Sequence, residues 1–283
     1  MNPLDPQWLD AQYNNRARVP DHAAIFERWR NASRLAREQS RCKLDVAYGD
    51  GADERLDVFP ATRPGAPVLV FIHGGYWRAF DKADQSFIAP SFVADGAAVL
   101  VPNYSLCPAV SIEQIALQMT RVVAWAWHHA TEFGGDPSRI ALVGHSAGGH
   151  LAAMLLCCRW KEVDAELPLL PLQGALSISG LYDLEPIRHT PFLAADLGLT
   201  PASVKRLSPS FFPRPKRPLY AVVGGDESEE FLHQGQLIRD QWGPTAVPVC
   251  ETLVGHHHFD VLRNLVDPAG RLHDLALRLL GLR

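Results

Sequence analysis

Gly144, Ser146 and Gly148 follow the spacing Gly-x-Ser-x-Gly, which suits a nucleophilic serine. An apolar run at 140–144 precedes the serine, and a helical pattern at 149–156 follows it. On a tight turn between a strand and a helix, the serine hydroxyl stands clear of the backbone, and small residues two positions away relieve crowding. The helix also directs backbone N–H groups and its positive dipole end toward a developing oxyanion. We therefore predict that Ser146 attacks a carbonyl carbon.

A serine hydroxyl is a weak nucleophile until a base removes its proton, so the chain must supply an imidazole and a carboxylate that orients it. Residues 224–228 read Gly-Gly-Asp-Glu-Ser and follow an apolar run downstream of Ser146. Asp226 and Glu227 can each serve as this acid. We favour Glu227, because the preceding glycines give the loop room to turn its side chain inward and Asp226 suits a helix cap.

The candidate base lies in residues 255–260, which read Gly-His-His-His-Phe-Asp. We favour His258, because it directly precedes Phe259, an apolar residue suited to pack at a helix start. His256 and His257 are the alternatives. Three adjacent histidines also suggest a metal site, but neighbours in a row do not easily face one ion and no second ligand cluster lies nearby. We predict neither a metal nor another cofactor.

The predicted reaction also needs two backbone N–H donors that form an oxyanion hole. We expect one from Ala147, which follows the predicted nucleophile. The other is expected from residues 73–77, His-Gly-Gly-Tyr-Trp, at the end of a continuous apolar run. Glycines let a backbone approach the substrate closely, so we assign this donor to Gly75, with Gly74 or Tyr76 as further contributors.

The elements that position these residues alternate along the chain: two short strands joined by a turn, and then strands alternating with helices. The predicted strands are 43–49, 54–60, 67–72, 97–101, 139–144, 174–179, 218–223 and 247–253. The predicted helices are 85–95, 109–133, 147–158, 228–242 and 259–280. This order predicts an α/β fold with a mostly parallel, eight-stranded sheet, an antiparallel edge and helices on both faces. The motifs fall at the carboxyl ends of strands, where such sheets bind ligands.

The domain organisation follows from length and composition. A chain of 283 residues that is 47% hydrophobic can build one large core. We predict a single domain over residues 1–283, with a helical lead-in at about 5–40 and a small cap insertion at about 181–215. The cap region is rich in proline and reads as irregular, with one short helix near 201–207.

Charge and cysteine content exclude several classes of partner. The net charge is −4 and no Lys/Arg tract is present, so we expect no nucleic-acid binding. No apolar run approaches the 18 residues of a membrane span. The first residues lack a secretory pattern, and five cysteines form an odd, irregular set, so we expect reduced thiols and a cytoplasmic location. A homodimer is left open.

Taken together, these motifs resemble those of the α/β-hydrolase superfamily, in the branch of hormone-sensitive-lipase-like esterases and kynurenine formamidases. The resemblance rests on residues 73–77, 103–108, 144–148, 179–186, 227–231 and 258–259. Tyr76 and Trp77 after two glycines look like the formamidase branch, because the broader esterase branch usually has a third glycine there. The resemblance implies the α/β-hydrolase fold and supports Glu227 over Asp226, although the family also uses Asp as the acid.

The resemblance implies a serine hydrolase that acts on a small molecule through an acyl-enzyme. Tyr76, Trp77 and Tyr104 are the predicted substrate-binding residues, and Tyr182 and Phe192 could complete an aromatic pocket for a flat aryl formamide such as N-formylkynurenine. A general carboxylesterase that cleaves short-chain esters is the close alternative. Two further rivals are a non-catalytic, hydrolase-like binding module and a metal hydrolase that uses the three histidines.

Overall fold

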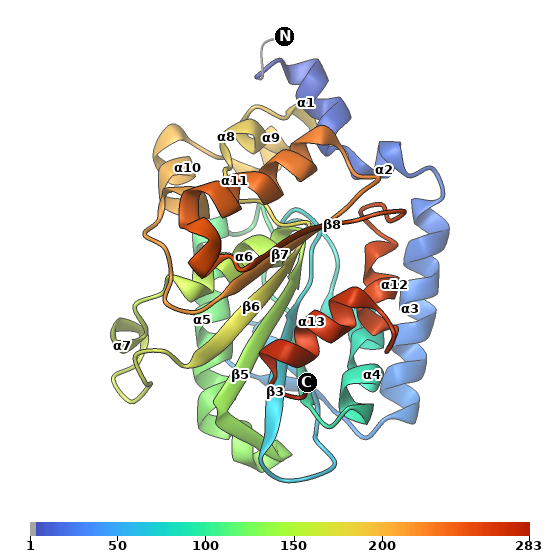
Figure 1. The fold of residues 1–283 in the computed structure, drawn as a ribbon, viewed down its shortest axis with the longest axis vertical. Coiled ribbons are helices and arrows are strands. Elements are labelled where there is room, and N and C mark those ends of the chain that lie inside the picture. Colours follow the sequence, from blue (N-terminus) through green and yellow to red (C-terminus); the bar gives the residue numbers. More distant parts are fainter. Residues whose placement is uncertain (1–3) are drawn as a thin grey trace.

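The computed structural model describes residues 4–283, so the first three residues of the predicted domain lie outside the described part. Its centre is an eight-stranded sheet with the strand order β1-β2-β4-β3-β5-β6-β7-β8 (Figure 1). The strands are β1 (Lys43–Ala47), β2 (Arg55–Phe59), β3 (Ala66–Ile72), β4 (Ala98–Pro102), β5 (Gly135–His145), β6 (Leu172–Ile178), β7 (Leu219–Gly224) and β8 (Val249–Leu253). β2 runs antiparallel to β1 and β4, and the remaining neighbours are parallel. The prediction of a mostly parallel sheet with an antiparallel edge is confirmed.

Helices connect the strands and cover both faces of the sheet (Figure 1). The longer helices are α3 (His22–Gln39), α5 (Ile112–His129), α6 (Ala147–Leu156), α11 (Glu229–Ala246) and α13 (Arg271–Leu279). The short ones in the body are α4 (Ala89–Ala94), α7 (Trp160–Val163), α12 (Val261–Val266) and the 3₁₀ turns η1 (Lys82–Asp84), η2 (Ser86–Ile88) and η3 (Ala130–Phe133). The predicted final helix at 259–280 is wrong, because a turn containing Pro268 and Gly270 separates α12 from α13.

Alternate side chains of the central strands enter two separate apolar cores. In β3, Val68, Val70 and Ile72 belong to one core, whereas Leu69 and Phe71 belong to the other. Helices α5, α6 and α11 cover the first core, and α3, α4, α12 and α13 cover the second. This alternation explains the continuous apolar sequence of β3, because a parallel strand in the middle of such a sheet is covered on both faces.

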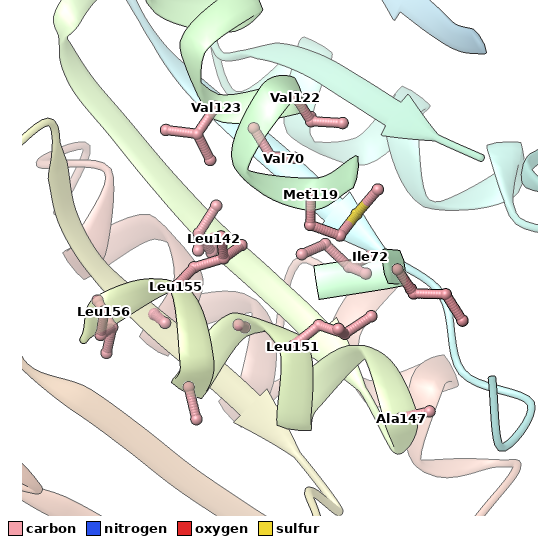
Figure 2. Packing of buried hydrophobic residues seen from close by; sticks show 14 of the residues in the cluster. Val70, Ile72, Met119, Val122, Val123, Leu142, Ala147, Leu151, Leu155 and Leu156 are labelled. Carbon is pink, nitrogen blue, oxygen red and sulfur yellow. The ribbon is translucent and has the colours of Figure 1, made fainter. Parts of the chain in front are cut away.

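The first core holds the start of α6 in place. Figure 2 shows Met119 of α5 and Leu151 of α6 near Ile72 and Leu142 of the two central strands. All four side chains are fully buried, and each such side chain contributes about 1.5–3 kcal/mol to stability. This packing therefore fixes the first turn of α6 beside the end of β3.

The cap region is more regular than predicted. It contains the short helices α8 (Glu185–Arg188), α9 (Pro191–Leu197) and α10 (Pro201–Leu207), followed by the 3₁₀ turn η4 (Pro209–Phe211). Pro186, Pro191 and Pro201 each occupy the first turn of one of the three helices. The fixed φ of proline suits this position, so these prolines start helices rather than prevent them.

The helical lead-in consists of α1 (Pro6–Tyr13), α2 (Asn15–Arg18) and α3. α1 packs against α9 and α11 at the top of the view in Figure 1, and α3 runs down its right-hand side. α2 therefore passes over the carboxyl ends of the strands, above the loops that carry the sequence motifs. Within residues 4–283, no helix combines the length and apolar character needed to cross a bilayer.

Candidate active site

Ser146 occupies a strained turn between β5 and α6. Its backbone has φ 56° and ψ −118°, a region that non-glycine residues rarely adopt. A Cβ atom at Gly144 would overlap the carbonyl oxygen of Gly148, and one at Gly148 would overlap the carbonyl oxygen of Ile72. The close approach of β5, α6 and β3 thus accounts for both glycines of the motif.

His258 and Glu227 form a buried, hydrogen-bonded pair on the loops after β8 and β7. The distance from His258 Nδ1 to Glu227 Oε2 is 2.6 Å. The Glu227 side chain is fully buried and that of His258 is 5% exposed. A carboxylate in this position makes Nδ1 the protonated nitrogen and leaves Nε2 free to accept a proton.

Two further donors hold the second oxygen of the Glu227 carboxylate. Ser179 Oγ donates to Oε1 at 2.5 Å, and the Gly224 backbone N–H donates to the same oxygen at 2.8 Å. Ser179 itself has a positive φ of 53°. The sequence of residues 179–186 does not predict this role for Ser179, because the contact arises only when β6 and β7 lie side by side.

Asp226, the alternative acid, points elsewhere. It is exposed, and its backbone N–H donates to the carbonyl oxygen of His256 at 3.0 Å. The prediction that it caps the next helix is wrong, because the Ser228 side chain accepts the hydrogen bond from Phe231 N at the start of α11. The structure therefore joins His258 to Glu227 and not to Asp226.

The three adjacent histidines do not face a common point. His258 turns toward Glu227, whereas His256 and His257 approach Asp260 at 3.7 Å and 3.6 Å. No group of three or more His, Cys, Asp or Glu side chains in the described chain has the arrangement of a metal site.

His145, the residue before Ser146, supports His258. Its Nε2 lies 2.8 Å from the carbonyl oxygen of His258, and the two rings are 4.8 Å apart. Burial, with a smaller contribution from the charge of His258, holds the pKa of His145 well below its usual value. His145 is therefore a neutral group that anchors the loop carrying His258.

The loop after β3 approaches Ser146 closely. A Cβ atom at Gly74 would lie 3.0 Å from Ser146 Cβ, so only glycine leaves that space open. Gly75, Tyr76 and Trp77 all have positive φ, with values of 103°, 50° and 57°. In residues 4–283, the N–H groups of Gly75 and Ala147 donate no hydrogen bond, so both are free to bind an oxyanion.

Tyr104 braces this loop from behind. Its hydroxyl donates to the carbonyl oxygens of His73 and Gly74, at 2.9 Å and 3.2 Å. Its ring stacks on His73 with a 4.2 Å separation between centroids. Tyr104 is 1% exposed, so the structure places it as a support of the loop and not on the cavity wall.

A cavity of about 270 Å³ opens beside Ser146. Its lining includes the predicted residues Gly75, Tyr76, Ser146 and His258. In the described residues, no hydrogen bond joins the Ser146 hydroxyl to the His258 ring, although both groups border this cavity. Such contacts are often long until substrate is bound.

Trp77, one of the predicted substrate-binding residues, does not reach this cavity. It is fully buried and meets the His150 ring edge-on at 5.0 Å. Phe192 of α9 does line the cavity, and its ring meets that of Tyr76 at 5.9 Å. Tyr182 lies in the core, where its hydroxyl donates to Ser177 Oγ. The aromatic wall is therefore smaller than predicted.

The N-terminal lead-in also contributes to the cavity, which the sequence motifs do not predict. Asn14, Asn15 and Arg16 line the cavity from the side opposite the sheet. The Tyr76 hydroxyl donates to the carbonyl oxygen of Tyr13 at 2.7 Å and ties the lead-in to the loop after β3. No local signal marks these residues, since their place depends on the path of the chain over the sheet.

The sheet order and the strained serine turn define an α/β-hydrolase fold. A family model described as BD-FAE matches residues 56–177. The chain is 30% identical to a kynurenine formamidase of Danio rerio over 98% of this chain and 96% of that protein. It is also 36% identical to esterase LipC of Mycobacterium tuberculosis over 52% of this chain and 38% of that protein.

Solved structures agree with this assignment. The crystal structure of a protein assigned as a thioesterase from Silicibacter sp. TM1040 is 31% identical and superposes with a TM-score of 0.81, covering 93% of this chain and 97% of the other. The chain belongs to the α/β-hydrolase superfamily, in the branch that contains the kynurenine formamidases and related esterases, and it is a hydrolase.

Proposed function

We propose that this hydrolase transfers an acyl group to water through an acyl-enzyme on Ser146. His258 removes the Ser146 proton while the serine oxygen attacks the substrate carbonyl carbon. The N–H groups of Ala147 and Gly75 hold the oxyanion, and Gly74 is a further contributor. Glu227 keeps His258 in the required tautomer and stabilises the imidazolium that forms.

The remaining steps return every group to its starting state. The tetrahedral intermediate breaks its bond to the amine or alcohol, and this leaving group takes the proton from the His258 imidazolium. A water molecule then gives a proton to His258 and attacks the acyl carbon. When the carboxylic acid leaves, His258 returns the proton to the Ser146 oxygen.

One observation carries this proposal: Ser146 and His258, which lie far apart along the chain, border the same cavity. The buried Glu227 carboxylate lies directly behind His258, at 2.6 Å. The free N–H groups of Gly75 and Ala147 supply the additional feature that a simple buried ion pair would not need.

We further propose that the substrate is a small aryl formamide of the N-formylkynurenine type. The relatives named kynurenine formamidase, which match almost the whole chain, support this assignment. A cavity of about 270 Å³ favours a small substrate, and the rings of Tyr76 and Phe192 suit a flat one. Short-chain esters are the second candidate, which the esterase relatives support.

The test compares N-formylkynurenine with p-nitrophenyl acetate on the wild type and on Ser146→Ala. We expect the wild type to cleave the formamide with the higher kcat/KM and the variant to lose both activities by several orders of magnitude. Preference for the ester by orders of magnitude would reject the formamidase assignment. Wild-type turnover by Ser146→Ala would reject the whole mechanism.

Two rival functions have separate tests. A non-catalytic binding module would leave Ser146 unlabelled by a fluorophosphonate probe, whereas we expect rapid labelling that depends on His258. A metal hydrolase would lose activity in EDTA, whereas we expect activity to persist after dialysis against the chelator. In both experiments, the fold is monitored by circular dichroism.

We also propose a reducing, cytoplasmic setting, with a small molecule as the binding partner. All five cysteines, which lie within the described chain, are free thiols, and this state suits a reducing compartment. Cell fractionation tests the location. Sedimentation velocity decides between a monomer and a homodimer.

A further inference from the structure

The cavity beside Ser146 has an unbalanced positive charge. Two arginines line it: Arg16 of α2, and Arg78, which directly follows the loop of residues 73–77. Among its lining residues, all of which lie in the described chain, none is Asp or Glu. A small cavity with two guanidinium groups and no lining carboxylate favours an anionic ligand over a neutral or cationic one.

Arg78 is held in place by the cap. It forms an ion pair with Asp196 of α9, and its guanidinium lies 5.4 Å from the centre of the Phe192 ring. Asp196 therefore balances much of the charge of Arg78. The same contacts hold the guanidinium rigidly at the cavity, which lowers the entropy cost of binding a ligand there.

Among the described residues, Arg16 has no acidic side chain that offsets its charge in this way. Within residues 4–283 it forms no ion pair, and its guanidinium lies 5.6 Å from the centre of the Phe26 ring. Burial, and then the charge of Arg78, lower the pKa of Arg16 from its usual value. The contribution of Arg78 shows that the two cations lie close enough to repel each other, and an anion between them would relieve this repulsion.

Asn15 provides an independent sign of a missing acceptor. It lines the same cavity and is only 5% exposed. Its Nδ2 group is buried and donates no hydrogen bond among the described residues. A buried donor without a partner is unfavourable, so a ligand oxygen that accepts from Asn15 Nδ2 would remove this penalty.

We propose that Arg16, together with Asn15 and Arg78, binds a carboxylate of the substrate, so that the enzyme selects substrates whose leaving group carries a carboxylate. This inference rests on the proposed function and narrows its substrate class. The carboxylate lies on the leaving-group side, because the acyl group of a formamide is only a formyl group. N-formylkynurenine carries such a carboxylate on its amino-acid side chain, whereas simple aryl esters do not.

The experiment compares N-formylkynurenine with its carboxamide, in which only the carboxylate charge is removed. The variants are Arg16→Gln, Arg16→Lys and the matched control Arg18→Gln, because Arg18 is an exposed arginine of the same helix outside this cavity. We expect the wild type to prefer the acid by about 10-fold to 100-fold in kcat/KM, which is the effect of one charge-assisted hydrogen bond. Arg16→Gln should bring this ratio close to one, mainly through KM. Arg16→Lys should restore part of it, and Arg18→Gln should leave it at the wild-type value.

Each result bears on the proposal separately from the mechanism. If Arg16→Gln keeps the wild-type ratio of acid to carboxamide, the carboxylate site is wrong, and the proposed chemistry still stands wherever Ser146→Ala is inactive. If neither formamide is cleaved, the formamidase assignment fails. The same ratio is then measured with the acetate ester of 4-hydroxyphenylacetic acid, whose leaving group carries the carboxylate, and with its neutral carboxamide. If the kcat/KM ratio of acid to carboxamide for these esters is the same in Arg16→Gln as in the wild type, the inference is overturned.

Discussion

Replacing Glu227 by glutamine tests what the buried carboxylate does for His258. The carboxylate accepts three hydrogen bonds: from Ser179 Oγ and Gly224 N on one oxygen, and from His258 on the other. A backbone N–H can only donate, so the amide oxygen of glutamine must face Gly224. The amide NH₂ group must then face His258 Nδ1, which becomes an acceptor.

This reversal places the imidazole proton on Nε2, the nitrogen that accepts the Ser146 proton in the proposed mechanism. Glu227→Gln should therefore lower kcat by about 10³-fold to 10⁴-fold, as expected when a triad acid becomes a neutral amide. This loss corresponds to about 4–5 kcal/mol of barrier. The fold should survive, because glutamine has the same shape and keeps the hydrogen bonds from Ser179 and Gly224.

The assay measures kcat and kcat/KM on both candidate substrates, with thermal unfolding as the control for folding. Asp226→Asn is the matched variant, since it makes the same chemical change one residue away at an exposed side chain. We expect Asp226→Asn to stay within about twofold of the wild type. A large loss in Asp226→Asn together with near-normal activity in Glu227→Gln would refute the assignment of the acid.

Three further predictions concern stability and the loop after β3. Gly148→Ala should destabilise the fold by more than about 1–3 kcal/mol in urea unfolding, because the new methyl group overlaps a backbone carbonyl of β3. The control Gly235→Ala lies inside α11, where the new methyl group has 3.7 Å of clearance, and should stabilise the fold by about 0.5–1 kcal/mol. Tyr104→Phe should lower kcat about tenfold by removing the hydroxyl that braces the loop, and equal losses in Tyr182→Phe, which leaves the loop untouched, would contradict this reason. Burial lowers the pKa of His150 to about 4, so the unfolded chain takes up this proton first as the pH falls below 6.5. Stability should thus drop by about 2 kcal/mol from this group between pH 7.5 and 5, and an unchanged urea midpoint would exclude the effect.

The sheet was predictable because each central strand is buried on both faces and so reads as a continuous apolar run. The errors lie where local patterns compete. The apolar positions of α12 and α13 continue one helical pattern across Pro268 and Gly270, and the prediction followed the pattern rather than the break. In the cap, proline was taken as a sign of irregular structure, whereas Pro186, Pro191 and Pro201 start helices.

The site was predictable only as far as its motifs are local. The serine turn and the glycine loop owe their geometry to crowding within a few residues, so their sequences carry it. Ser179 supports Glu227 through the pairing of β6 with β7, and Asn15 and Arg16 reach the cavity because α2 crosses the sheet ends. These contacts join distant parts of the chain and leave no pattern in any single segment. Tyr104 shows the converse error: the sequence predicts that this aromatic residue binds substrate, whereas in the structure it supports the loop after β3.

Backbone strain gathers at this end of the sheet. In residues 4–283, six non-glycine residues have positive φ, and five of them lie around the site: Tyr76, Trp77, Phe80, Ser146 and Ser179. Each such conformation costs about 1–3 kcal/mol and persists only where its surroundings determine it. The two apolar cores on the opposite faces of the sheet offset that cost. A substitution that loosens the first core, against which α6 packs, should therefore impair catalysis before it unfolds the protein, because the strained serine turn relaxes first.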